Sequence, residues 1–255
     1  MTIQIENLSK SFQDGDRRVV ALDDIDMRIE EGSFTTIMGP SGCGKSTLLN
    51  VLAGLLSQDT GKIRRDGNLT SSSDLPIAYV FQEPRLLDWR TVGENIKFAM
   101  RAQGVPSDEH DRRITDTLSM VGLGDERDSY PLRLSGGQRQ RVGIARALSV
   151  NPDVLLMDEP FSELDEISAH QLRDDLIDLW QETGKTVLFV THDISEAIYL
   201  SDKILFLDTE GHVFNRATIE CDRPREPDDP RLSEIETTLM DTFFEHMERI
   251  ERSDP

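Results

Sequence analysis

Short apolar runs, spaced along the chain with helical patterns between them, indicate the framework of the fold. Runs at 35–38, 154–157 and 187–190 have the length and composition of buried parallel strands. Apolar residues recur with helical spacing at about 45–56, 137–150 and 167–183. Strands that alternate with helices in this way predict an α/β protein with a three-layer core.

Two further regions accompany this core. Alternating residues between positions 2 and 30, with a short strand at 61–67 that closes in Asp66-Gly67, predict an antiparallel β lobe. Residues 87–150 contain several helical stretches and no clear strand, which predicts an inserted helical lobe.

The C-terminal part has a different pattern. Residues 220–230 are rich in proline and charge and are typical of a linker. Apolar residues then recur every three or four positions, at Leu232, Ile235, Leu239, Phe243, Met247 and Ile250. We therefore expect one domain over 1–219 and a linker with an amphipathic helix over 220–255. This helix either packs on its own domain or contacts a second subunit or a regulator.

Composition limits the partners. Lys and Arg total 28 against 48 Asp and Glu, a net charge of −20, which argues against nucleic acid as a partner. The acidic surface, with six lysines among those 28 residues, favours a high-salt cytoplasm, and an ordinary acidic protein is the alternative. No apolar run has the length of a membrane span, no secretory signal is visible, and two cysteines form no disulfide framework. These features predict a soluble, intracellular protein.

A glycine-rich segment between an expected strand and an expected helix fits the pattern G-x-x-x-x-G-K-[ST]. Its residues are Gly39, Pro40, Ser41, Gly42, Cys43, Gly44, Lys45, Ser46 and Thr47. Backbone amides of such a loop converge on phosphate, Lys45 can reach the β- and γ-phosphates, and the Ser46 hydroxyl can ligate Mg²⁺. A glycine-rich turn without a ligand is the alternative, and the strand–helix context favours nucleotide binding.

Two adjacent acids end the apolar run at 154–157. We expect Asp158 to hold Mg²⁺ through water and Glu159 to polarise the water that attacks the γ-phosphate. The alternative is a solvated strand end. The phosphate-binding motif in the same chain favours the catalytic interpretation.

The five residues Leu134-Ser135-Gly136-Gly137-Gln138 lie between these two motifs and precede an expected helix. With them, the chain resembles the ATP-binding cassette (ABC) family over about residues 1–215. The resemblance implies a P-loop NTPase fold and a homodimer that closes over two ATP molecules. Ser135, Gly136, Gly137 and Gln138 would then face the γ-phosphate that the other subunit holds.

The same resemblance implies roles for single positions. Phe12 resembles the aromatic residue that stacks on adenine, and a core phenylalanine is the alternative. Gln82 resembles the glutamine that contacts Mg²⁺ and the water, and His192 the switch histidine at the γ-phosphate. Asp165 ends the loop that touches the opposite subunit, in which Glu163 replaces the commoner alanine.

A single cassette without a membrane span resembles the ATPase subunit of an importer. The resemblance implies separate permease subunits, a solute-binding protein and a place at the cytoplasmic face of the membrane. Residues 83–92 are similar to the nitrate, sulfonate and taurine importer group, and 165–167 with 199–202 to its pyrimidine-precursor or riboflavin branch. We expect Leu86, Leu87 and Trp89 to form an exposed patch for the permease or else the core of the helical lobe. The alternative functions are those of a soluble, non-transport ABC ATPase and of an exporter subunit.

Overall fold

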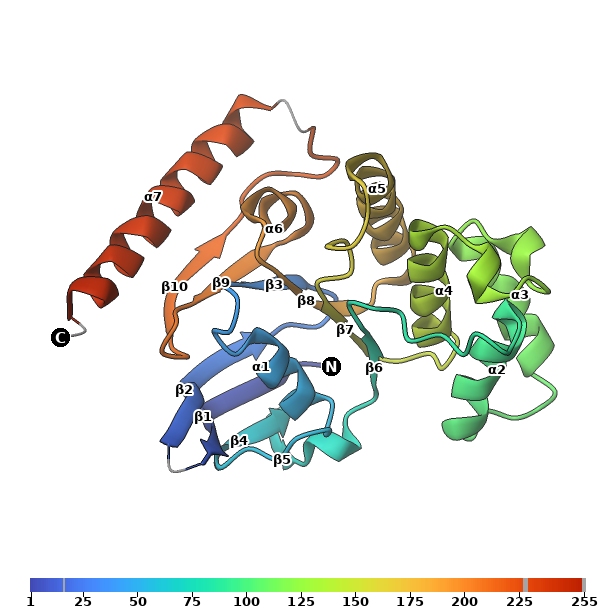
Figure 1. The fold of residues 1–255 in the computed structure, drawn as a ribbon, viewed down its shortest axis with the longest axis horizontal. Helices are drawn as coiled ribbons and strands as arrows, with labels where there is room; N and C mark the ends of the chain where they lie inside the picture. The colour runs from blue at the N-terminus through green and yellow to red at the C-terminus, as the bar shows by residue number, and fades with distance from the viewer. Residues whose placement is uncertain (16, 227–228, 254–255) are drawn as a thin grey trace. The chain divides into compact units, whose positions relative to one another are not determined.

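The computed structural model describes residues 1–15, 17–226 and 229–253. The chain divides into two compact units. Figure 1 colours the ribbon by residue number, so the segments of each unit can be followed in it. The first unit combines Met1–Leu75 with Leu188–Pro255, and the second is Pro76–Val187. The separation of 1–219 from 220–255 as domains stays a prediction.

An antiparallel sheet forms the first part of unit one, in the strand order β2-β1-β4-β5. Its strands are β1 (Ile3–Asp14), β2 (Arg17–Ile29), β4 (Thr60–Arg65) and β5 (Asn68–Thr70). Asp66 and Gly67 join the last two strands with φ angles of 49° and 81°, which an Asp-Gly pair adopts at low cost. The expected antiparallel lobe is confirmed.

The strand that leads into the glycine-rich motif, β3, lies in a second sheet of the same unit. Its order is β10-β9-β3-β8, with β3 parallel to β9 and β10 antiparallel to it. The bounds are β3 (Phe34–Met38), β8 (Thr186–Thr191, beginning in unit two), β9 (Lys203–Leu207) and β10 (Val213–Thr218). All five residues of β3 are buried, as expected for a strand covered on both faces.

Helices α1 (Lys45–Leu52) and α6 (Ile194–Leu200) follow β3 and β8, and a 3₁₀ turn covers Ser72–Asp74. Helix α1 is shorter than the predicted 45–56. It ends because Gly54 takes a φ angle of 70°, which a helix cannot continue through.

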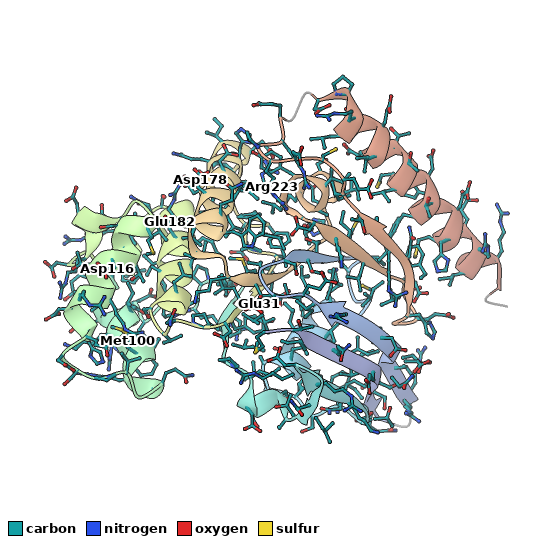
Figure 2. The ribbon with its side chains drawn as sticks, turned by 180° about the vertical axis from the view of Figure 1, so that it is seen from behind. Glu31, Met100, Asp116, Asp178, Glu182 and Arg223 are labelled. Carbon is teal, nitrogen blue, oxygen red and sulfur yellow. The ribbon has the colours of Figure 1, made fainter. Side chains whose placement is uncertain are left out.

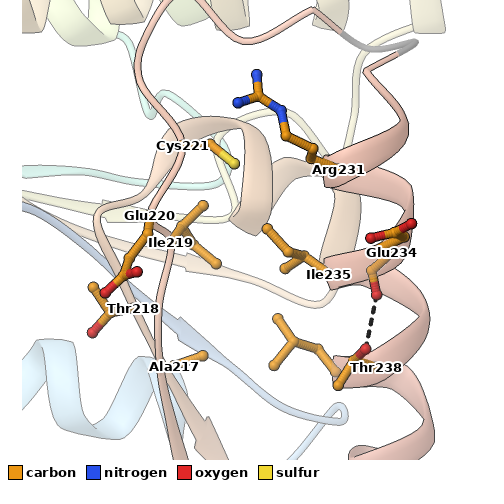
Figure 3. Close-up of a pocket in the computed structure, with 10 residues that line it drawn as sticks. Ala217, Thr218, Ile219, Glu220, Cys221, Arg231, Glu234, Ile235 and Thr238 are labelled. Atoms are coloured by element: carbon orange, nitrogen blue, oxygen red, sulfur yellow. Dashed lines mark hydrogen bonds between the residues drawn. The ribbon is translucent and has the colours of Figure 1, made fainter.

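The C-terminal amphipathic helix is present as α7 (Pro230–Ser253) and packs on its own unit. Leu232 and Leu239 are buried in a cluster with residues of α6 and β9, and Phe243 lies against Phe206 and Phe214. A groove of about 430 Å³ runs between the end of β10 and α7, with Ile219 and Ile235 among its lining residues (Figure 3). Packing on its own cassette, one of the two expected arrangements, is confirmed.

Unit two contains a parallel strand pair, β6 (Ile77–Val80) and β7 (Val154–Asp158). Its helices are α2 (Val92–Ala102), α3 (His110–Met120), α4 (Gly136–Leu148) and α5 (Glu166–Thr183), with 3₁₀ turns at Gly124–Glu126 and Pro131–Arg133. Residues 87–150 contain helices and no strand, which confirms the helical lobe. Together the two units confirm the α/β class.

Acidic side chains are exposed on both units. Figure 2 labels Glu31, Asp116, Asp178 and Glu182, all of which are exposed, whereas the labelled Met100 is buried among the helices of unit two. No described helix is long and apolar enough to cross a membrane.

Candidate functional site

The loop between β3 and α1 has a backbone path that only glycine permits at two positions. A Cβ atom on Gly39 would lie 2.5 Å from the carbonyl oxygen of Leu207. Gly44 has a φ angle of 100°, and a Cβ there would overlap the carbonyl oxygen of Ala21. The glycines of the motif therefore let the loop pack closely on β9 and β2, with α1 beginning at the next residue.

Lys45 is the first residue of α1, and its side chain folds back onto this loop. Its side chain is buried, and Nζ donates hydrogen bonds to the carbonyl oxygens of Gly39 at 2.9 Å and Pro40 at 3.0 Å. The ammonium group is thus held over the loop, while Ser41, Gly42 and Ser46 are exposed and Thr47 is half-buried. Gly44 provides no side-chain cap for α1, whose first amides therefore have no side-chain acceptor from the N-cap.

Cys43 contributes its backbone rather than its thiol to this loop. The side chain is 2% exposed, and its Sγ lies 2.7 Å from the Cβ position of Gly39, on the inner side. Burial raises the pKa of the Cys43 thiol, and nearby Lys45 opposes that shift. The thiol is therefore a packing group beneath the backbone of this loop.

Phe12 is exposed at the end of the β1–β2 hairpin. Its ring is 39% exposed, pairs in register with Val19, and has Nζ of Lys10 5.5 Å from its centroid. The core alternative for Phe12 is therefore wrong. An exposed aromatic face beside Val19 offers a surface on which a base can stack.

His192 lies in a tight turn between β8 and α6 and is exposed. The turn is fixed on both sides, because the buried hydroxyl of Thr191 donates to Glu196 at 2.7 Å and accepts the N–H of Asp193 at 3.0 Å. The Asp193 carboxylate also caps α6, with Ser195 N–H at 2.8 Å and Glu196 N–H at 3.1 Å. The backbone of His192 is therefore fixed at an exposed position.

In unit two, Asp158 ends β7 beside a half-buried phenol. Tyr79 of β6 donates from its hydroxyl to Oδ2 of Asp158 at 2.9 Å. Burial, together with the Asp158 carboxylate, raises the pKa of the Tyr79 phenol far above its ordinary value. The phenol is thus a permanent hydrogen-bond donor that orients the carboxylate.

Glu159 follows with a φ angle of 43°, which is rare for a residue with a long side chain. The Ser162 hydroxyl donates to the carbonyl oxygen of Glu159 at 2.9 Å, and Nε2 of Gln82 donates to the same hydroxyl at 3.1 Å. Backbone strain of this kind costs on the order of 1–3 kcal/mol and is concentrated at functional sites. Within unit two, Ser162 therefore joins two of the predicted catalytic residues.

Ser135 is the N-cap of α4 and forms a capping box with Gln138. The Ser135 hydroxyl accepts from Gln138 N–H at 3.2 Å, and Gln138 Oε1 accepts from Ser135 N–H at 2.9 Å. Cβ atoms on Gly136 and Gly137 would meet Leu164 and Ser168 at 3.5 and 3.6 Å, which are ordinary contacts. The fold of the single chain therefore does not require glycine at these two positions.

Asp165 has a capping role in the same region. It is the N-cap of α5, accepting from Ser168 N–H at 3.0 Å and from the Ser168 hydroxyl at 2.7 Å. These hydrogen bonds, the hydroxyl first, lower the pKa of the exposed Asp165 carboxyl. Glu163 in the preceding loop is exposed.

The segment after Gln82 presents an exposed aromatic residue. Trp89 is 72% exposed, whereas Leu86 and Leu87 are half-buried. The buried Asn95 amide fixes this segment through Leu87 N–H at 2.7 Å and several carbonyl groups, and Arg146 donates to Pro84 and Arg85. The core alternative is therefore wrong for Trp89, and an exposed patch that also includes Leu86 and Leu87 stays a prediction.

Sequence reasoning missed the supporting roles of four residues at the site. Tyr79, Ser162, Thr191 and Glu196 hold the predicted residues through hydrogen bonds. Ser162 and Thr191 stand beside the motifs in the sequence, but their partners depend on turns that spacing alone does not specify. Only the register of β6 with β7, in which Tyr79 pairs with Leu156, places the phenol of Tyr79 at Asp158.

These features define an ATP-binding cassette: a phosphate loop on β3, a strand that ends in paired acids, and a capped Ser-Gly-Gly helix start. The sequence pattern of the ABC transporter family matches residues 22–162. The chain belongs to this family.

Three relatives match over most of their length. A taurine import ATP-binding protein of Rhizobium johnstonii is 44% identical over 80% of this chain and 78% of its own. An aliphatic sulfonates import ATP-binding protein of Bacillus cereus is 38% identical over 95% and 96%. A nitrate import ATP-binding protein of Synechococcus elongatus is 36% identical over 95% and 91%.

A solved structure confirms the P-loop NTPase fold. The dimeric, post-hydrolysis state of an ATP-binding cassette with ADP and Pi has a TM-score of 0.75 and 33% sequence identity. The match covers 86% of this chain and all of that chain.

Proposed function

We propose that this chain is the ATP-hydrolysing subunit of an ABC importer and energises uptake of a small solute through a separate permease. The observation that carries the proposal is the complete set of cassette motifs on a fold shared with a cassette that holds ADP and Pi. The names of three relatives, for taurine, sulfonates and nitrate, support import and a small solute that carries a sulfonate or a similar oxyanion group. The vitamin-precursor branch stays a prediction that no observation favours.

In the first unit, we assign phosphate binding to residues 39–47 and base stacking to Phe12. Lys45 is held over the loop by two carbonyl groups and would bind the β- and γ-phosphates with its ammonium group. The exposed Phe12 ring can stack on adenine without a hydroxyl group. His192 would contact the γ-phosphate, because its backbone is fixed and its ring is exposed.

In the second unit, we assign water activation to Glu159 with Gln82. The shared contact with Ser162 supports a common function for these two residues. The side-chain oxygens of Gln82 and Asp158 in this unit, and the hydroxyl of Ser46 in the first unit, are ligands of the kind that Mg²⁺ prefers. The chemistry of these three residues therefore fits the ion. When bound, Mg²⁺ would neutralise charge on the β- and γ-phosphates.

We propose that two copies of the chain close over ATP. Gly136 and Gly137 support this assignment, because the single chain has room for a side chain at both positions. Glycine there is explained by the close approach of a phosphate from a second subunit to the start of α4. The same contact would include Ser135, Gln138 and Asp165. Ser135 and Asp165 are the N-caps of α4 and α5, and Gln138 completes the capping box of α4.

The permease would bind at the exposed Trp89. A side chain with 72% of its surface exposed, on a segment fixed by Asn95 and Arg146, provides a rigid apolar anchor. A solute-binding protein would act with the permease and would not contact this chain. The site of action would be the cytoplasmic face of the membrane.

An affinity pull-down from native membranes, with mass spectrometry of the bound proteins, tests the transport assignment. The tagged wild-type chain should recover a multi-span permease, and Trp89→Ala should recover much less of it. Leu132→Ala, which removes another exposed apolar side chain of unit two, is the matched control. Recovery of ribosomal or DNA-repair proteins without a permease would contradict the proposal.

A further inference from the structure

We infer that Asp208 and His246 are positioning residues for the phosphate loop, so that the C-terminal helix α7 supports the nucleotide site. The inference rests on the proposed phosphate-binding role of residues 39–47. It assigns a function to α7 beyond covering the apolar surface of its own unit.

The turn between β9 and β10 is in direct contact with the backbone around the phosphate loop. Leu207, the last residue of β9, closely approaches Gly39 with its carbonyl oxygen. Gly211 in the turn packs on Ala21, and its carbonyl oxygen accepts from Asp23 N–H at 3.0 Å. The same Ala21 carbonyl faces Gly44. A shift of this turn would therefore change the path of the phosphate loop at both of its ends.

Asp208 holds this turn in shape. Its side chain is buried, and Oδ1 accepts the N–H groups of Glu210 and His212, both at 3.0 Å. Its own N–H donates to His212 oxygen at 3.0 Å. The second oxygen, Oδ2, lies 3.2 Å from Nε2 of His246 on α7. One carboxylate thus closes the turn and binds the C-terminal helix.

His246 is oriented for this contact by a second interaction. Its ring stacks on Phe214 of β10, with centroids 3.9 Å apart and planes 3° from parallel. The stack fixes the plane of the ring, so that Nε2 remains directed at Asp208. Because a buried carboxylate needs its hydrogen bonds, loss of the His246 donor is expected to loosen the turn.

A second contact joins α7 to the other nucleotide-binding element of this unit. The Ser195 hydroxyl, three positions after His192, donates to Glu236 of α7 at 3.0 Å. Helix α7 therefore contacts Ser195, close to His192, through Glu236. Through His246 it contacts the turn that packs against the phosphate loop. Apolar packing of Leu232, Leu239 and Phe243 explains the stability of α7 but does not require these two polar contacts.

The test compares two substitutions at one position in the full chain. His246→Phe keeps the ring stack and the approximate volume but removes the donor, and His246→Gln keeps a donor without the ring. Asp241→Ala, an exposed position of α7, is the control. We would measure the Kd of a fluorescent ATP analogue with Mg²⁺, the ATPase KM and kcat, and the Tm.

We expect His246→Phe to raise the Kd and the KM for ATP about fivefold, with kcat at saturating ATP nearly unchanged. The Tm should fall by about 2–4 °C, because one buried oxygen of Asp208 loses its donor. His246→Gln should retain part of the affinity, and Asp241→Ala should match the wild type. An unchanged Kd in His246→Phe, or an equal loss in His246→Gln, would overturn the inference. A wild-type chain that does not bind ATP would instead contradict the proposed function.

Discussion

The phenol of Tyr79 donates a hydrogen bond to the carboxylate of Asp158, across the parallel strand pair β6 and β7. We propose that Asp158 holds Mg²⁺ through water and that Tyr79, as an outer partner, orients its carboxylate. Outer partners of metal ligands typically change affinity or activity by about 10–100-fold when they are replaced. The pair therefore provides two separate tests.

The first prediction concerns the Mg²⁺ dependence of hydrolysis. Tyr79→Phe should raise the Mg²⁺ concentration for half-maximal ATPase by about tenfold, because Asp158 loses its orienting donor. Steady-state assays across a Mg²⁺ series measure this shift. Tyr130→Phe, at an exposed position, is the matched control. A Tyr79→Phe variant with the wild-type Mg²⁺ dependence would show that the pair has no role in the reaction.

The second prediction concerns stability at high pH. Because burial raises the pKa of Tyr79, the folded chain keeps its phenol proton where the unfolded chain loses it. This stabilisation is complete below the ordinary tyrosine pKa of about 10 and is lost as pH rises toward the folded pKa. Between about pH 10 and 11, the wild type should therefore lose unfolding free energy more steeply than Tyr79→Phe. Parallel urea-denaturation curves for the two proteins would disprove the role of the phenol.

The third prediction separates glycines needed by the fold from glycines needed by the dimer. Gly136→Ala and Gly137→Ala should leave the Tm unchanged or slightly higher, since both Cβ atoms fit and alanine favours helix. Their ATPase should fall by about tenfold or more. Gly39→Ala is the contrasting variant, because its Cβ would lie 2.5 Å from a backbone oxygen. It should lose about 1–3 kcal/mol of stability. Equal activity in Gly136→Ala and the wild type would count against the dimer contact.

Sequence reasoning could find the parts of the fold and site whose residues are neighbours in sequence, and it could not find contacts between residues far apart in the chain. The residues of the phosphate loop could be found because a strand, a glycine turn and Lys45 are contiguous in sequence. The capping residues of α4 and α5 could be found because Ser135 and Asp165 lie next to the helices they cap. By contrast, the contact of Asp208 with His246 joins residues 38 positions apart, and only the packing of α7 brings them together.

Thiol reactivity is a further test of how the phosphate loop is packed. The Cys43 thiol is buried and its pKa is raised, so little thiolate is present at neutral pH. Under native conditions, an aromatic disulfide reagent should label the half-buried Cys221 first. In a Cys221→Ser variant, Cys43 should react at least about 100-fold more slowly than in denaturant. Rapid native labelling of Cys43 would contradict the inward position of its side chain.

The central claim is that two copies of this chain close over ATP and part after hydrolysis. Glu159→Gln keeps the shape of the strained residue but removes the base, so ATP should remain bound. Light scattering with size-exclusion chromatography, in ATP and Mg²⁺, is the most direct measurement. We predict a mass twice the 28.8 kDa of one chain for this variant, and a return to 28.8 kDa when ATP is left out. A Glu159→Gln protein that binds ATP and stays at 28.8 kDa would contradict the account.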